Sequence, residues 1–413
     1  MTTGIYYWKI ITKNIGNMRV VHFNTIDQGG SYKAAVRIHR GLIMAGAHSS
    51  LLLRTKSDKS GEGCEVIDRP AKSLLSKAKN VGNLLLSTDD IITDMFGTEV
   101  TRLDKVQNAD AIIIHWCNSF LGYKQYRKLA SLGKPVLVVG HDMWACTGGC
   151  HYDEWCGEFE DGCRDCPMAK KGFLPGMRQR IVNANYNAKI KAFSNLSYVG
   201  VSNWSLSVAE RSPIWKNNHK CVILNPVDYD VFHPTSVTKY EYLRDNSDQK
   251  IILYGAARTF SQKYKGGDDL IRVIDNLHID NYKVVIFGNV SDDAIKNIRF
   301  PLVNLGYIDS EHDMAQLYSF ADVFVNTSFQ ESFCYTVGEA LACHTPVVAY
   351  GVGGINDQVQ HKVNGYLVPV GNTEELAGGI EYCLTHEMTS INLHNSLMET
   401  GKRYLGFIKD ISQ

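Results

Sequence analysis

Short runs of apolar, often β-branched residues recur along both halves of the chain, separated by longer segments with the hydrophobic period of a helix. In the first half these runs lie at residues 19–23, 111–115, 135–140 and 198–201. In the second half they lie at 251–254, 283–287, 323–326 and 346–350. Continuous apolar runs that alternate with helices are typical of parallel strands buried on both faces. The pattern therefore predicts an α/β fold with one Rossmann-like sheet in each half.

The domain organisation follows from the length and from one interruption of the pattern. A chain of 413 residues is long for a single hydrophobic core, which favours two domains. We expect a first domain at 18–219 and a second at 251–395. Asn225-Pro226 and the polar stretch that follows break regular structure between them, and this predicts a hinge and linker at 220–250.

Charge and hydropathy exclude several classes of protein. Lys plus Arg and Asp plus Glu are equal at 43 each, so no overall charge favours nucleic acid, and a small-molecule partner is expected. No apolar run approaches the roughly 18–20 residues that a helix needs to cross a bilayer. Residues 1–17 lack the apolar core and cleavage site of a signal peptide, so we expect a cytoplasmic protein. This segment is interpreted as an added arm or as the result of a start codon assigned too early.

Glycine spacing argues against two common nucleotide chemistries. Neither half carries the G-x-G-x-x-G of a dinucleotide site or the G-x-x-x-x-G-K-[ST] of a phosphate loop in its expected place. Nicotinamide chemistry and ATP hydrolysis are therefore not expected.

The segment 329–354, FQESFCYTVGEALACHTPVVAYGVGG, places two carboxylates around one predicted helix start. Glu331 follows a predicted strand and its loop, whereas Glu339 lies early in a helix that begins near Tyr335 and Thr336. A helix N-terminus has free backbone N–H groups and a partial positive charge, which favour a phosphate. A diphosphate sugar suits this site, with the carboxylates holding sugar hydroxyls. On spacing alone, the alternative is that both carboxylates only favour the helix dipole and contact water.

This segment resembles the E-x7-E signature of the family 4 retaining glycosyltransferases, whose pattern is close to E-S-F-G-x-x-x-x-E-A-x-A-x-G-x-P-V-V-A. Three further stretches resemble family elements in the family order: KCVILNPVDYDVFHP, LYGAARTFSQKYKGG and LGYIDSEHDMAQLYSFADVFVNTS. Together the four cover most of residues 220–372. The resemblance implies a GT-B architecture, in which two Rossmann-like domains face each other across a cleft. The first domain would bind mainly the acceptor and the second mainly the donor. A final helix at 396–413 that crosses back to the first domain is common in that fold.

The resemblance also assigns roles in the second domain. Arg258 and Lys265 would hold the diphosphate of a nucleotide sugar and stabilise its charge as it leaves, so no catalytic metal is expected. Glu331 would orient the donor sugar and Glu339 the ribose. The residues between them complete the expected donor site: Phe333, Cys334, Tyr335 and Thr336. Without the resemblance, one Arg and one Lys on a loop are more often solvated charges.

Three residues differ from the family pattern. Cys334 and His344 stand where Gly is usual, and Pro226 follows Asn225 where the family often has Gly. Because Gly lets a ligand approach the backbone closely, a side chain at Cys334 is expected to crowd the donor sugar. The identity of the donor therefore stays open.

Two positions in the first half follow predicted strands. Gly29 and Gly30, in IDQGGS, either let a phosphate or sugar approach the backbone or form a plain turn. His141, in VVGHDMW, ends a strand at the same sheet edge, where α/β sheets bind their ligands. A His at a strand end is usually structural, but the family has a Gly-rich loop and an H-D element at these two places. The resemblance therefore puts Gly29 and Gly30 in the donor site and His141 at the reacting face.

A cysteine-rich segment follows the H-D element: five of the 11 cysteines lie within residues 146–166, among glycines and acidic residues. Its C-x-x-C is a zinc-knuckle spacing, which favours a structural zinc ion in a tetrahedral site that shapes a loop near the acceptor. The predicted ligands are Cys150, Cys156, Cys163 and Cys166, with His151 or Cys146 as substitutes. Free thiols and disulfides are the alternatives, and a reducing compartment disfavours disulfides.

Taken together, the resemblance implies a retaining hexosyltransferase that moves a sugar from a nucleotide diphosphate sugar to a glycan or lipid-linked acceptor. Family members with a similar cysteine segment are typical of bacterial surface polysaccharide pathways, which adds peripheral association with the inner membrane as an option. The alternatives are a sugar-nucleotide epimerase of similar fold and a non-catalytic sugar-nucleotide-binding protein.

Overall fold

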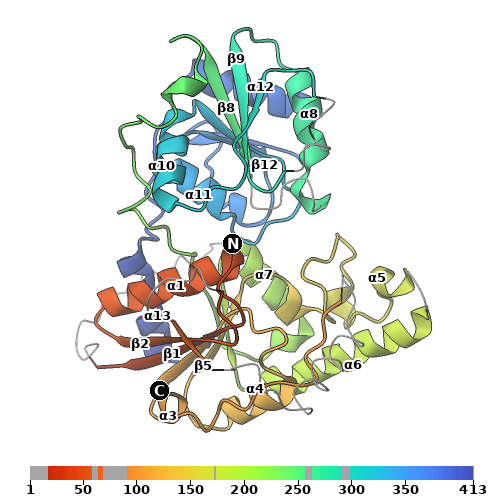
Figure 1. Ribbon diagram of the computed structural model, residues 1–413. Coiled ribbons are helices and arrows are strands. Elements are labelled where there is room, and N and C mark those ends of the chain that lie inside the picture. The colour runs from red at the N-terminus through yellow and green to blue at the C-terminus, as the bar shows by residue number, and fades with distance from the viewer. Residues whose placement is uncertain are drawn as a thin grey trace, which may run out of the picture.

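The computed structural model describes residues 17–57, 64–67, 91–171, 174–255, 263–290, 295 and 298–412. Within these ranges the chain forms two parallel sheets of seven and six strands, each packed against helices (Figure 1). This confirms the α/β fold class and the two Rossmann-like sheets. Arg258 and residues 1–16 of the expected N-terminal arm lie outside the described residues.

The first sheet has the strand order β3-β2-β1-β4-β5-β6-β7. Its strands are β1 (Arg19–Asn24), β2 (His48–Leu53), β3 (Cys64–Val66), β4 (Ala111–Ile114), β5 (Val136–Gly140), β6 (Ser197–Gly200) and β7 (Lys220–Val222). The helices in this part of the chain include α1 (Gly29–Met44), α3 (Asp104–Gln107), α4 (Tyr123–Ala130), α5 (Pro167–Lys170), α6 (Pro175–Phe193) and α7 (Asn203–Arg211). Strands β4, β5 and β6 are buried at every position, because both faces of a parallel sheet are covered.

The second sheet has the order β10-β9-β8-β11-β12-β13. Its strands are β8 (Lys250–Gly255), β9 (Tyr282–Phe287), β10 (Leu302–Asn304), β11 (Val323–Asn326), β12 (Val347–Tyr350) and β13 (Gly365–Val368). The helices include α8 (Gly267–Asp275), α10 (Glu311–Phe320), α11 (Tyr335–Ala342), α12 (Thr373–Thr385) and α13 (Leu397–Asp410). Across the part of the chain that the structure describes, no helix combines the length and apolar character needed to cross a membrane.

Both sheets have a point at which the strand order reverses. It lies between β1 and β4 in the first sheet and between β8 and β11 in the second. Parallel pairing across these points brings the carboxyl ends of the strands to one edge. Open α/β sheets bind ligands in such crevices. At these edges lie Gly29 and Gly30, in the first turn of α1 after β1, and the segments that carry Lys265 after β8 and Glu331 after β11.

The last helix, α13, follows the second sheet in the chain but packs along α1 of the first domain (Figure 1). Ser396 starts it with a capping box, in which Ser396 and Glu399 each accept a hydrogen bond from the other's backbone N–H. Glycine lets the two helices approach closely, since a Cβ at Gly401 would lie 2.1 Å from the carbonyl oxygen of Gly41. α13 therefore ties the end of the chain to the first domain.

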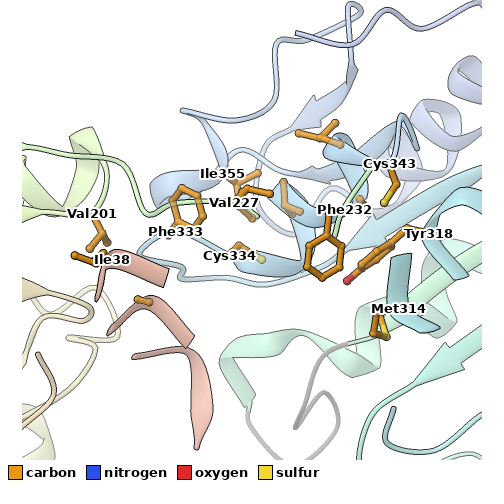
Figure 2. Packing of buried hydrophobic residues seen from close by; sticks show 14 of the residues in the cluster. Ile38, Val201, Val227, Phe232, Met314, Tyr318, Phe333, Cys334, Cys343 and Ile355 are labelled. Atoms are coloured by element: carbon orange, nitrogen blue, oxygen red, sulfur yellow. The ribbon is translucent and has the colours of Figure 1, made fainter. Parts of the chain in front are cut away.

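One hydrophobic cluster continues from the first domain into the second, and Figure 2 shows part of it. Ile38 of α1 and Val201 after β6 belong to the first domain. Phe232 of the linker packs beside Tyr318 of α10, with ring centroids 6.3 Å apart. The apolar contacts are continuous from one domain to the other. Polar side chains at the domain junction therefore pack against buried residues of both domains.

Candidate functional site

Lys265 and Glu331 form an ion pair at the carboxyl edge of the second sheet. The Ser328 hydroxyl donates a further hydrogen bond of 3.1 Å to the same oxygen, Glu331 Oε1. Burial opposes the charged form of Lys265, but the neighbouring Glu331 carboxylate raises the pKa of the lysine above its ordinary value. Lys265 is therefore a fixed positive charge near neutral pH, of the kind that binds phosphate.

Contacts between two loops position Lys265. Gly266 has a left-handed backbone (φ 66°), and a Cβ there would lie 2.0 Å from the carbonyl oxygen of Thr327. The Thr327 hydroxyl donates a hydrogen bond of 2.7 Å to the Gly266 carbonyl. Because only Gly tolerates this approach, the Lys265-Gly266 pair places the amine beside the loop that carries Glu331.

Two glycines after β12 support the backbone of Glu331. The N–H of Gly354 donates a hydrogen bond of 3.0 Å to the Glu331 carbonyl. Gly353 has φ 50°, and a Cβ there would lie 1.7 Å from the same carbonyl oxygen. The Gly pair that ends the signature segment therefore packs directly against its first glutamate.

The start of α11 explains two departures from the family pattern. The helix begins at Tyr335, and its N-cap residue, Cys334, has a left-handed backbone with φ 71°. His344, after the same helix, has φ 63°. Glycine adopts this backbone without strain, which is the physical reason for Gly at both positions in the pattern. The Cys334 sulfur lies 3.4 Å from both Asn326 Nδ2 and the Thr336 hydroxyl, so this side chain packs against the end of β11.

The aromatic members of the predicted donor site pack at the domain junction. Phe333 is buried, and its ring meets that of Tyr335 edge-on with centroids 5.3 Å apart. The Arg37 guanidinium lies 4.8 Å from the centroid of the Tyr335 ring. These side chains therefore stabilise the junction, while backbone N–H groups at the start of α11 are the donors suited to an anion.

Glu339 is buried at this junction and accepts hydrogen bonds from two cations of α1. Lys33 donates at 2.9 Å and Arg37 at 2.8 Å, both to Glu339 Oε1, and Arg37 also donates to Glu311 of α10 at 2.9 Å. Burial opposes the charged form of Arg37, but Glu339 and then Glu311 raise its pKa. The predicted ribose ligand is thus part of an ion-pair cluster between the domains.

Sequence reasoning missed the basic members of this cluster. Lys33 and Arg37 are 306 and 302 positions from Glu339, so no local pattern links them to it. One signal was present, because the two basic residues are spaced i, i+4 on the helix that follows the Gly pair.

Gly29 and Gly30 form the first turn of α1. A Cβ added at either glycine would meet no other atom within 4 Å. The N-cap residue, Gln28, makes no side-chain hydrogen bond to the helix. This helix start is therefore uncrowded and can accept a phosphate or a sugar.

Three histidines at neighbouring strands of the first sheet form a hydrogen-bonded chain. His22 Nδ1 lies 3.0 Å from His115 Nε2, and His115 Nδ1 lies 2.9 Å from His141 Nε2. Burial lowers the pKa of His141 to about 4 and holds those of His22 and His115 well below the ordinary value. All three rings are neutral near pH 7, and one nitrogen of His141 is engaged by His115. The sequence indicated His141 but neither of its partners.

The structure does not support the predicted zinc site. The predicted ligands were Cys150, Cys156, Cys163 and Cys166. All four lie in described parts of the chain, and all four are free thiols. Within those parts, no group of three or more His, Cys, Asp or Glu residues could hold a metal ion. His151, a substitute ligand, pairs instead with Asp142 at 2.6 Å.

Buried polar contacts hold the cysteine-rich segment. Lys189 of α6 is fully buried and donates hydrogen bonds to the carbonyl oxygens of Trp144 (2.5 Å) and Thr147 (3.0 Å). Burial lowers the pKa of Lys189 to about 8 and raises that of the Cys163 thiol to about 12. The sulfur of Cys163 accepts a hydrogen bond of 3.2 Å from the N–H of Gly148. Packing and hydrogen bonds thus supply the stability that the zinc prediction assigned to a metal.

Comparison with known proteins finds a family match for the second half of the chain. Residues 241–404 match the model of the family described as Glycosyl transferases group 1. A D-inositol 3-phosphate glycosyltransferase from Mycobacteroides abscessus is 32% identical over 172 residues, which are 38% of this chain and 38% of that protein. An N,N'-diacetylbacillosaminyl-diphospho-undecaprenol alpha-1,3-N-acetylgalactosaminyltransferase from Campylobacter jejuni is 23% identical over 242 residues, or 57% of this chain and 62% of that protein. Both matches span less than two thirds of the relative's length.

The fold likeness covers more of the chain than the sequence matches do. The structure of Anabaena HepE in complex with UDP-glucose is similar with a TM-score of 0.59 and 15% identity, over 96% of this chain and 97% of that one. At this identity the likeness shows the fold alone. The family match contains Lys265, Glu331 and Glu339, three residues described above in the second domain. Residues 241–404 therefore carry a glycosyl transferases group 1 domain, in a chain whose two parallel sheets have the two-domain GT-B fold.

Proposed function

We propose that the protein is a retaining glycosyltransferase that moves a hexose-type sugar from a nucleotide diphosphate sugar to a glycan or lipid-linked acceptor. The Lys265–Glu331 pair beside the start of α11 carries this proposal. A fixed cation and helix N–H groups suit a departing diphosphate, whereas a carboxylate suits sugar hydroxyls. Two relatives support the substrate classes: HepE binds UDP-glucose, and the Campylobacter enzyme is named for a diphospho-undecaprenol-linked sugar. A bacterial surface polysaccharide pathway is the proposed setting.

In this proposal the second domain binds the donor. Lys265, together with Arg258, binds the diphosphate and meets the negative charge that grows as it leaves. Glu331 orients the donor sugar. Glu339 accepts a hydrogen bond from the ribose, and its ion pair with Arg37 fixes the orientation of the carboxylate.

The first domain supplies the opposite wall of the reaction site. The uncrowded start of α1 at Gly29 and Gly30 approaches the donor, and neutral His141 contributes a hydrogen bond at the reacting face. Retention follows from a front-face displacement or a short-lived ion pair. The bond between the anomeric carbon and the phosphate oxygen breaks as the acceptor oxygen forms the new glycosidic bond. The leaving phosphate takes up the proton of the acceptor hydroxyl.

Thermal unfolding with a panel of UDP, GDP, ADP and dTDP sugars tests donor binding. A ligand at 100 times its Kd stabilises the folded protein by about 2.7 kcal/mol, so the true donor should raise the melting temperature. If no nucleotide sugar of the panel raises the melting temperature, the proposal is contradicted. Donor binding without transfer to any acceptor would favour the non-catalytic alternative, and interconversion of the free sugar nucleotide would favour the epimerase.

We also propose peripheral binding to an anionic membrane through the tip formed by α5 and the start of α6, at the outer edge of the first domain (Figure 1). Leu174 and Met177 are 47% and 55% exposed there. Lys170, Lys171 and Arg180 are exposed beside them. Apolar side chains combined with basic ones favour anionic lipid surfaces. A basic residue near such a surface contributes about 1 kcal/mol, and Lys170 and Lys171 share their charge with Asp165 and Glu154, with which they pair.

Co-sedimentation with vesicles tests this placement. The protein should bind phosphatidylglycerol vesicles more than phosphatidylcholine vesicles, and Met177→Glu should weaken that binding. Binding that is absent, or equal for the two lipids, would contradict it.

A further inference from the structure

A pocket of about 330 Å³ lies between the cysteine-rich segment and α7 on one side and the loops after β11 and β12 on the other. Its walls include Trp155 and Trp204 from the first domain and Phe329, Gln330 and Glu331 from the second. The volume falls within the range of small-molecule sites. Because Glu331 forms part of the wall, the pocket adjoins the proposed reaction site.

Trp155 is an exposed aromatic residue on a turn with two left-handed backbone residues. Its side chain is 62% exposed, although a large aromatic side chain is normally buried. Glu154 and Trp155 both have left-handed backbones, with φ 46° and 61°. Such backbone strain is tolerated where surrounding contacts hold it, and it is frequent at ligand sites. The Trp155 ring is tilted toward Phe329, with centroids 6.3 Å apart, so two aromatic faces line the pocket.

Asp153 holds this turn and links it to the loop of the second domain that carries Glu331. Its carboxylate accepts hydrogen bonds from the N–H groups of Trp155 (3.1 Å) and Gly157 (3.2 Å). It also accepts a hydrogen bond of 2.9 Å from Gln330 Nε2. Gln330 immediately precedes Glu331, so the position of Trp155 is coupled to that of the proposed sugar-binding carboxylate.

The pocket also offers polar groups for a ligand. Gln330 is 6% exposed, and its Oε1 has no hydrogen-bond partner among the described residues. A buried unpaired amide oxygen is unfavourable unless a ligand or water donates to it. Arg211 and Glu331 add charged groups to the wall. Aromatic faces together with several convergent hydrogen-bonding groups suit a sugar ring, whose C–H face is apolar and whose hydroxyls are polar.

We propose that this pocket binds a sugar ring of the acceptor, stacked on Trp155 and hydrogen-bonded to Gln330. The proposal rests on the glycosyltransferase function above and narrows its acceptor to a carbohydrate. The cysteine-rich segment then has a function, since it presents the aromatic wall of the acceptor site. An acceptor in which only a lipid or a phosphate meets the protein does not use these polar and aromatic groups together.

Saturation-transfer difference NMR with methyl α-glycosides of glucose, galactose, mannose and N-acetylglucosamine tests the pocket, in the presence of UDP. We expect transfer to the ring protons of at least one glycoside. Trp155→Ala should raise its Kd about tenfold, as expected for loss of an aromatic stacking contact. Trp155→Phe should retain most of the affinity. The matched control is Tyr242→Ala, which removes a 69% exposed aromatic residue outside the pocket and should leave the Kd unchanged.

The outcomes separate this inference from the proposed function. Melting curves with the nucleotide-sugar panel report the donor site, whereas methyl glycosides report the Trp155 pocket. Stabilisation by a nucleotide sugar with no glycoside binding, or with a Kd that Trp155→Ala leaves unchanged, would overturn the acceptor assignment alone. Absence of any nucleotide-sugar binding would overturn the function on which the assignment rests. A melting curve of Trp155→Ala should show that the variant is folded, so that its glycoside Kd can be compared with that of the unsubstituted protein.

Discussion

Arg37 of α1 donates a hydrogen bond of 2.8 Å to Glu339 of α11, which joins two residues 302 positions apart in the chain. Their side chains are 2% and 3% exposed, so the ion pair is shielded from solvent. The same carboxylate is the proposed ribose ligand. In the proposed function, domain contact and donor binding therefore share one residue, and the junction would hold Glu339 in place before a donor arrives.

Arg37→Ala is expected to destabilise the protein by about 3 kcal/mol, because the buried Glu339 carboxylate loses one cation and keeps only the half-exposed Lys33 of the two on α1. Urea unfolding measures the change. The matched control is Arg19→Ala, since the Arg19–Asp110 pair has side chains 55% and 42% exposed and such pairs contribute about 0–1 kcal/mol. Equal effects of the two substitutions would show that the junction does not depend on Arg37.

Glu339→Gln should raise KM for the donor more than it lowers kcat, because the ribose is remote from the bond that breaks. Glu374→Gln, at the exposed start of α12, is the control and should change neither. Steady-state kinetics with the donor identified by thermal shift measures both constants. A large fall in kcat at constant KM would place Glu339 at the reacting bond instead.

Lys265→Ala should lower kcat by about 100-fold or more, corresponding to roughly 3 kcal/mol for one preorganised electrostatic group. The reason is that charge on the diphosphate grows toward the transition state, where the Lys265 amine meets it. Lys105→Ala removes a lysine that pairs on the surface with Glu65 and serves as the control. A change confined to KM would mean that Lys265 binds the donor without assisting its departure.

The histidine chain should make stability depend on pH between about 6.5 and 4. Burial lowers the pKa of His141 to about 4, so the unfolded state binds more protons than the folded state in this window. The contribution of neutral His141 to the free energy of unfolding is fully present above about pH 6.5. It is lost as the pH falls toward 4, by about 3 kcal/mol for His141 alone. His141→Gln should reduce this slope, measured by urea unfolding at several pH values. His278→Gln, which changes an exposed histidine, should leave the slope as it is.

Local patterns in the sequence were sufficient for the fold. The apolar run at 323–326 coincides with β11, and the helix expected near Tyr335 begins at that residue. Lys265 and Glu331, which the family resemblance singled out in short motifs next to strands, form an ion pair in the structure. Strand and helix formation depend on neighbouring residues, so their signals are readable along the chain.

Only the tertiary structure decided which side chains meet. The partners of Glu339 are more than 300 positions away, His22 and His115 are 93 positions apart, and Asp153 and Gln330 are 177 apart. Cysteine spacing suggested a zinc site, but spacing does not specify where folded side chains point, and the segment is held by buried Lys189 instead. Hydrogen bonds, ion pairs and burial require distance and orientation in space, and these exist only once the two sheets have packed together.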